Sequence, residues 1–226
     1  MLSLWEKGAN RHALDRSLLL CAWARPDLSD DTIADLPLGT VTASLLRLRE
    51  ASFGTRIDCH VDCEHCGERI ALALFSPDLL QPATENGREI EVLSWRARAP
   101  SLRDLAAAAG DAGIDRAARR LLAGCGAGDV AEAEAMPEDG FRRVEDALEA
   151  LDPNADLALD LACAACGRTG IAQLDVGALL WDEIDAHARG LLSEVDALAR
   201  AYGWTEGEIL GLGAVRRGAY LAMVVG

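Results

Sequence analysis

The stretches Cys63-Glu64-His65-Cys66-Gly67 and Cys163-Ala164-Ala165-Cys166-Gly167 decide how this chain of 226 residues folds. Each stretch, called a knuckle below, places two thiols two residues apart and follows them with a glycine, which permits a tight backbone turn beneath the sulfurs. Two knuckles together supply four thiolates, the number that closes a tetrahedral zinc site. The sequence therefore predicts a structural Zn²⁺ held by Cys63, Cys66, Cys163 and Cys166.

The cysteines also admit other interpretations. A redox dithiol normally lies at a helix N-terminus, and a catalytic zinc keeps an open coordination position, so the predicted hairpin tips and four thiolates disfavour both. Metal-free buried thiols remain an alternative. His65 could bind the metal but is expected to be a solvated tip residue, and Cys59 is expected to pack in its strand. Cys21 and Cys125 have no partner pattern and are expected to be small core or surface residues.

Strand-like segments flank both knuckles. Each knuckle therefore forms the tip of a predicted hairpin, and Glu89–Arg98 is predicted as one further strand. The four hairpin strands are expected at Thr55–Val61, Arg69–Phe75, Asp156–Leu161 and Arg168–Leu174.

The remaining sequence favours helices, because alanine and leucine dominate and aromatic residues make up only 4%. The predicted fold class is α+β, mostly helical, with a small zinc-ribbon-like β-core and a C-terminal helical arm. The expected segments are 1–54 (N-terminal helical segment), 55–84 (first knuckle hairpin), 85–151 (strand and helical insertion), 152–175 (second knuckle hairpin) and 176–226 (C-terminal helical arm).

Helix caps and apolar spacing define the arm most clearly. Asp175 is a predicted N-cap for a helix over Val176–Ala201, whose apolar face repeats in steps of three and four. His187 falls on this face and is expected to be a core residue. Capping boxes are predicted to begin at Thr205 and, in the insertion, at Ser101.

Composition and charge exclude several functions. The net charge of −15 opposes binding to nucleic-acid phosphates. No segment has the apolar length that spans a membrane, and the N-terminus lacks the pattern of a secretion signal, so a cytoplasmic location is expected. There is no nucleophile elbow, phosphate-binding glycine loop or paired metal-ligating histidines. We therefore expect a non-enzymatic protein without a small-molecule substrate.

Three blocks of sequence resemble the T4-type baseplate proteins, often labelled baseplate hub assembly chaperones, of contractile phage tails and contractile injection systems. The resemblance covers residues 36–68 and 150–222, and covers the insertion poorly. The blocks are Leu36–Thr40 with Leu45–Gly54 and the first knuckle; Asp152–Asp156 with the second knuckle and Leu180–Ile184; and Leu191–Leu210 with Arg216-Arg217-x-x-Tyr220-Leu221.

This resemblance implies a non-enzymatic role in assembling or forming a baseplate, with hub or wedge proteins as partners. It makes the segment from Trp204 to Tyr220 the candidate partner-binding surface, because aromatic residues and arginines are enriched at binding hot spots. The candidate residues are Trp204, Glu208, Arg216, Arg217 and Tyr220. Phage members of the family need not carry the thiol pairs. The alternative function is a zinc-ribbon nucleic-acid-binding or regulatory adaptor protein.

Overall fold

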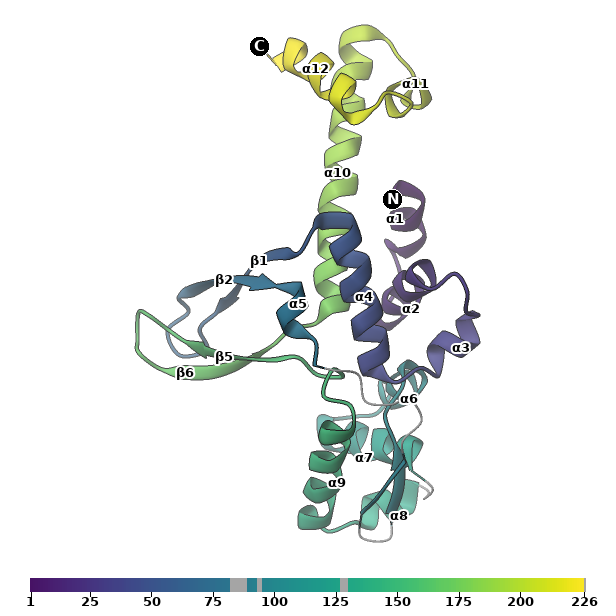
Figure 1. Ribbon diagram of the computed structural model, residues 1–226, viewed down its shortest axis with the longest axis vertical. Coiled ribbons are helices and arrows are strands. Elements are labelled where there is room, and N and C mark those ends of the chain that lie inside the picture. Colours follow the sequence, from purple (N-terminus) through teal and green to yellow (C-terminus); the bar gives the residue numbers. More distant parts are fainter. Residues whose placement is uncertain (82–88, 93–94, 127–129, 226) are drawn as a thin grey trace. The chain divides into compact units, whose positions relative to one another are not determined.

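The computed structural model describes residues 1–81, 89–92, 95–126 and 130–225 (Figure 1). It is a mixed α+β protein, 59% helical, with small two-stranded antiparallel sheets, which confirms the predicted fold class. The helices are α1 (Leu2–Gly8), α2 (Ala13–Ala24), α3 (Asp30–Ala34), α4 (Leu38–Phe53), α5 (Ser76–Leu79), α6 (Leu102–Ala108), α7 (Ile114–Cys125), α8 (Val130–Ala135), α9 (Glu138–Leu151), α10 (Val176–Tyr202), α11 (Glu206–Leu210) and α12 (Ala214–Val225). The strands are β1 (Arg56–Asp62), β2 (Arg69–Phe75), β3 (Glu89–Val92), β4 (Trp95–Arg98), β5 (Ala158–Ala162) and β6 (Thr169–Gln173).

The chain divides into two compact units. One unit contains residues 12–180, and the other contains residues 1–11 together with 181–226. The division falls inside α10, whose first five residues belong to the larger unit. No sequence pattern indicated that α1 belongs to the same unit as most of α10.

Helices α2, α3 and α4 form the apolar core of the larger unit. Ser29 caps α3 by accepting a hydrogen bond from the Thr32 amide at 3.2 Å, as expected of a hydroxyl before two acidic residues. The buried side chains of this core include Leu20, Cys21, Ile33, Val41, Leu45, Leu46 and Ile57. Cys21 is therefore a core residue, one of the two outcomes that the sequence left open.

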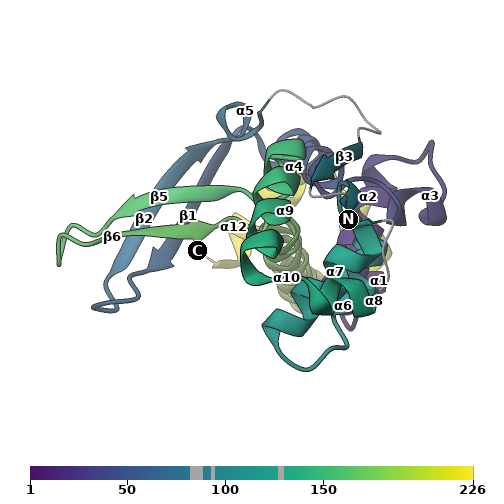
Figure 2. The ribbon, with the colours of Figure 1, turned by 90° about the horizontal axis from the view of Figure 1, so that it is seen from below.

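Both knuckles lie at the tips of antiparallel hairpins that lie side by side (Figure 2). The register places Cys59 opposite Leu72 in the first hairpin and Asp160 opposite Ile171 in the second. The observed strands agree with the predicted ones within two residues at each end. β1 and β5 both alternate exposed with half-buried or buried side chains, as strands with one covered face do.

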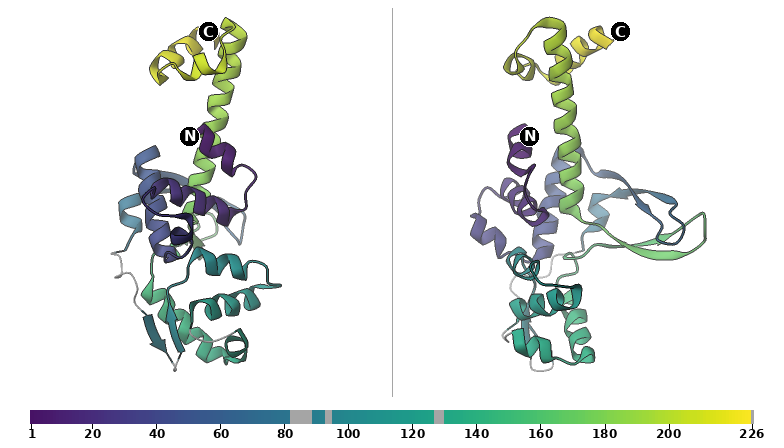
Figure 3. Two further views of the ribbon diagram at one scale, coloured as in Figure 1. Left: turned by 90° about the vertical axis from the view of Figure 1, so that its right-hand side faces the viewer. Right: turned by 180° about the vertical axis from the view of Figure 1, so that it is seen from behind.

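The insertion, drawn mostly in teal in Figure 3, is a group of short helices and a strand pair. It folds around its own apolar cluster of Leu122, Phe141 and Val144. The prediction of a single strand over Glu89–Arg98 is wrong, because β3 and β4 fold back as an antiparallel pair with Val92 opposite Trp95. Folding back brings both of these side chains onto the cluster, whereas one extended strand would have separated them. Residues 93 and 94 lie outside the described residues.

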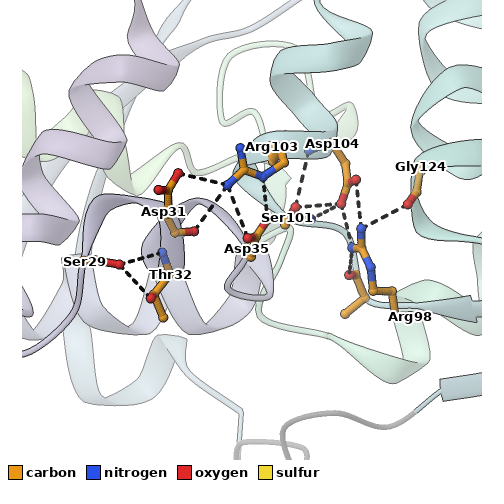
Figure 4. Close-up of polar contacts among 10 residues, drawn as sticks. Ser29, Asp31, Thr32, Asp35, Arg98, Ser101, Arg103, Asp104 and Gly124 are labelled. Atoms are coloured by element: carbon orange, nitrogen blue, oxygen red, sulfur yellow. Dashed lines mark hydrogen bonds and ion pairs between the residues drawn. The ribbon is translucent and has the colours of Figure 1, made fainter.

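A polar network joins the start of α6 to its surroundings (Figure 4). Ser101 and Asp104 form the predicted capping box, and the Asp104 carboxylate also accepts two hydrogen bonds from Arg98, at 2.7 and 3.0 Å. Desolvation raises the pKa of the Asp104 carboxyl, but its bonds with Arg98 and Ser101 outweigh this and hold the pKa below its usual value. Arg103 pairs with Asp35 at 2.6 Å and so connects α6 to the end of α3.

The smaller unit consists of the arm from residue 181 onward together with residues 1–11. Trp5 of α1 donates its indole N–H to Asp185 of α10 at 2.7 Å. At the start of α10, in the larger unit, the predicted cap Asp175 accepts from the Ala178 amide at 2.9 Å. The prediction for His187 is wrong, because its side chain is exposed while Ala188 is fully buried. The buried face of α10 passes through Ile184 and Ala188 and leaves position 187 at its margin.

Candidate metal centre

Each knuckle is a tight turn closed by its own backbone. In the first knuckle, the Cys63 amide donates to the Glu68 carbonyl and the Gly67 amide donates to the Cys63 carbonyl, both at 2.8 Å. Gly67 has a φ of 71°, a left-handed conformation that a residue with a Cβ adopts only under strain. This turn directs both thiols of the pair to the same side.

The second knuckle repeats this geometry. The Cys163 amide donates to the Arg168 carbonyl at 2.9 Å, the Gly167 amide donates to the Cys163 carbonyl at 2.8 Å, and Gly167 has a φ of 70°. The two hairpins therefore present their thiol pairs as matching halves of one site.

The four cysteines that the sequence singled out meet at one point. Their sulfur atoms all lie within 4.8 Å of one another, with 3.8 Å from Cys63 to Cys166 and 3.7 Å from Cys66 to Cys163. These distances are far longer than the roughly 2.05 Å of a disulfide bond. An ion that binds four sulfurs tetrahedrally at about 2.3 Å separates them by about 3.8 Å, since a tetrahedron's edge is about 1.63 times its centre-to-corner distance. The cluster can therefore accept a metal ion with little movement.

Backbone amides prepare the cluster to carry negative charge. The amides of His65 and Cys66 hydrogen-bond the Cys63 sulfur and lower the pKa of that thiol to about 6. The Glu68 amide lowers the pKa of Cys66, but desolvation and the neighbouring thiols, Cys163 first among them, outweigh it and raise that pKa to about 12. The Cys63 thiol thus ionises readily, and its negative charge disfavours ionisation of the neighbouring thiols. A bound cation would offset this repulsion and let all four sulfurs ionise.

The alternative ligands lie outside the cluster. His65 is exposed at the hairpin tip, and within the described residues the cysteines are the group whose donor atoms come close enough to share one ion. Cys59 is half-buried in β1, and Cys125 is buried at the end of α7. Burial raises the pKa of the Cys125 thiol to about 12, which keeps it protonated and unreactive.

Two side chains that were not predicted from the sequence hold the segment before the second hairpin in place. Asp152 accepts a hydrogen bond from the Gly39 amide at 2.8 Å. Asn154 accepts from the Gln81 amide at 2.8 Å and donates to the Gln81 carbonyl at 3.0 Å. Both side chains are buried, and we call these bonds the root contacts. They hold the segment before β5 against the start of α4 and against the chain after α5, the short helix that follows the first hairpin.

The arm residues proposed for partner binding are mostly engaged within the arm. Trp204 stacks on Tyr202 with ring centroids 4.7 Å apart, and Tyr220 packs edge-on against Trp204 at 4.9 Å. Glu208 completes the predicted capping box with Thr205. These contacts fix α11 and α12 to the end of α10.

The two arginines of α12 have different environments. The Arg217 side chain is 12% exposed and pairs with Glu194 of α10 at 2.6 Å. Arg216 is exposed, and so are the apolar Val215 and Met223 on the same helix. Among the described residues of α12, these three side chains are therefore accessible to a partner.

Comparison with family models, with curated proteins and with solved structures finds no match to this chain. Among the described residues, no helix combines the length and the apolar character needed to cross a membrane. The site must therefore be interpreted from its own chemistry.

Proposed function

We propose that this chain is a non-enzymatic assembly or structural protein of the baseplate of a phage-tail-like contractile injection system. The proposal rests on the resemblance of its three sequence blocks to T4-type baseplate proteins. The observation that best supports it is the bond between Gly39 and Asp152, one from each of the first two blocks, 113 residues apart. These blocks thus form one framework, and the third block forms the folded arm.

We propose that the cysteine cluster binds a single structural Zn²⁺. Four thiolates at tetrahedral spacing suit zinc, and they leave no coordination position for a substrate. Thiolate ligands persist in a reducing compartment, and the proposal therefore places the protein in the cytoplasm. Metal analysis of purified protein should give one zinc per chain and four thiols that react only after the metal is removed.

In this proposal the protein works through protein–protein contacts with hub or wedge proteins. The contact on the arm would be made by Arg216 and the exposed side of α12, since Arg217 is engaged with Glu194. Arg216→Glu should reduce recovery of the partner in pull-downs during particle assembly. Arg142→Glu, which alters an exposed arginine of the insertion, is the matched control and should not.

Mass spectrometry of assembly intermediates and mature particles tests the baseplate role itself. Presence in both would identify a structural component, and presence in intermediates alone would identify a chaperone. Normal particles from a deletion strain, together with no hub or wedge protein in the pull-down, would refute the proposal.

The alternative is a zinc-ribbon nucleic-acid-binding or regulatory adaptor protein, which the paired cysteine hairpins favour. Charge opposes nucleic-acid binding, because the two hairpins, residues 56–75 and 158–173, carry five carboxylates against three arginines. Gel-shift titrations with DNA and RNA test this alternative. Tight binding that weakens steeply with salt would support it over the baseplate role.

A further inference from the structure

A groove of about 360 Å³ lies between the two hairpins next to the cysteine cluster. Val61, Ile70 and Leu161 give it an apolar wall. Every residue of β6, from Thr169 to Gln173, also lines it. The face of a strand would contribute alternate residues, so this continuous run means that β6 presents its edge to the groove.

The register of the second hairpin shows which backbone groups lie on that edge. Leu174 donates its amide to the Leu157 carbonyl at 2.8 Å, and Cys163 donates to the Arg168 carbonyl at 2.9 Å. These two positions are therefore hydrogen-bonded pairs of the ladder. Bonded and non-bonded pairs alternate along antiparallel strands, which fixes the pairs that lie between them.

Thr169, Ile171 and Gln173 occupy the non-bonded pairs, so their N–H and C=O groups point away from β5. In the part of the chain that the structure describes, no other strand pairs with β6. Its side chains also lack the usual protection of an edge, since the strand reads Thr-Gly-Ile-Ala-Gln without charge or proline. Ile171, moreover, is 67% exposed.

The other edge of the same hairpin provides a contrast. Asp160 is the central outward-facing residue of β5, directly opposite Ile171, and places a charge on that edge. Charged side chains discourage strand addition. The hairpin therefore protects the β5 edge and leaves the β6 edge open.

The geometry points to β6 as the docking edge for an extended, basic segment of a partner protein, which adds to it as a third strand. Backbone hydrogen bonds to Thr169, Ile171 and Gln173 would hold the segment, and its apolar side chains would enter the groove. Asp62, which pairs with Arg69 at 3.5 Å, and Glu64 line the groove together with one arginine, Arg168, and the chain carries a net charge of −15. A basic segment complements this charge. The inference does not depend on the baseplate role.

Fluorescence anisotropy with the full-length, zinc-loaded protein tests the inference. The probe is a labelled nine-residue peptide that alternates valine and threonine and carries two lysines. It should bind, and it should bind about tenfold more weakly or worse when glutamates replace the lysines or when alternate backbone nitrogens are methylated. No measurable binding of the lysine peptide would overturn the inference.

Two proline variants distinguish binding at the β6 edge from binding at the β5 edge, and neither removes a hydrogen bond between β5 and β6. The Ile171 amide points away from β5, so Ile171→Pro removes a docking donor and keeps the bonds within the hairpin. Asp160→Pro does the same on the opposite edge. Ile171→Pro should abolish peptide binding while Asp160→Pro retains it, with zinc content and melting temperature confirming that both variants fold.

Ile171→Ala, which keeps the amide, should weaken binding less than Ile171→Pro does. Equal binding by the two proline variants would overturn the inference, because the peptide would then bind elsewhere. Sedimentation provides a further test. A dimer that Ile171→Pro dissociates would also overturn it, by showing that a second copy of the chain occupies the edge.

Discussion

Replacing Gly39 by alanine should destabilise the protein by about 3 kcal/mol, although helix propensity alone predicts a gain of up to about 1 kcal/mol. Gly39 lies in the first turn of α4, and a Cβ there would overlap Asp152 Oδ1 and lie 2.8 Å from its Cγ. Overpacking typically costs about 1–3 kcal/mol. Separating the two groups would also break the bond from the Gly39 amide to the buried carboxylate, at a cost of about 1–3 kcal/mol.

Urea unfolding with zinc in excess measures this cost, and a double-mutant cycle with Asp152→Ala identifies its origin. Asp152→Ala removes the overlapping carboxylate and leaves the contact with Asn154 Cβ at 3.0 Å. Gly39→Ala should then cost about 1 kcal/mol, a coupling of about 2 kcal/mol. Gly190→Ala is the matched control, because its Cβ would meet nothing within 4 Å, and it should be neutral or stabilising. Equal costs of Gly39→Ala in both backgrounds would refute this account of the root contacts.

Three further predictions concern the cysteine cluster, the pH dependence of stability and the arm. Cys66→Ser should lose the bound zinc and melt at a lower temperature, whereas Cys59→Ser should keep the zinc and the melting temperature of the parent protein. Mass spectrometry measures the metal content. Full metal retention by Cys66→Ser would show that the knuckles do not share a site. Burial raises the pKa of Asp152, so the stability that its protonated form contributes is lost as pH rises from the unfolded-state pKa through the folded-state pKa. Urea titrations should show Asp152→Asn gaining on the parent protein over that interval. A difference that does not vary with pH would contradict this. Glu194→Gln should cost about 2 kcal/mol, because it leaves the mostly buried Arg217 guanidinium without its counter-charge; an unchanged melting temperature would contradict that estimate.

Features encoded by neighbouring residues were predictable from the sequence. Both hairpins follow from thiol pairs, a turn glycine and alternating strands, and the Thr205 capping box follows from a hydroxyl and a carboxylate three residues apart. The four cysteines of the cluster were identified for the same reason, since each half of the cluster is a local motif. Only the meeting of the halves is a long-range event.

Features that depend on distant partners were missed. The hydrogen bond from the Gly39 amide to Asp152 could not be predicted from sequence periodicity. A glycine in the first turn of a helix can, however, indicate that another part of the chain approaches the backbone closely. The return of β3 onto β4 was missed because its cause, the packing of Trp95 on the insertion's apolar cluster, lies in helices that come later in the chain. His187 was wrongly predicted to be buried, because helical spacing identifies the apolar face of α10 but not where the buried part of that face ends.

The root contacts also affect how freely the insertion between the hairpins can change. The chain leaves the framework after Gln81 and rejoins it at Asp152, and these two points are held close by the bonds of Asn154 and Gly39. The entropy of closing a loop grows only with the logarithm of its length, so doubling the insertion would cost about 0.6 kcal/mol. That is no more than a single hydrogen bond contributes. Apart from the contacts of α6, the stretch can be lengthened, shortened or exchanged during evolution while the four cysteines still converge.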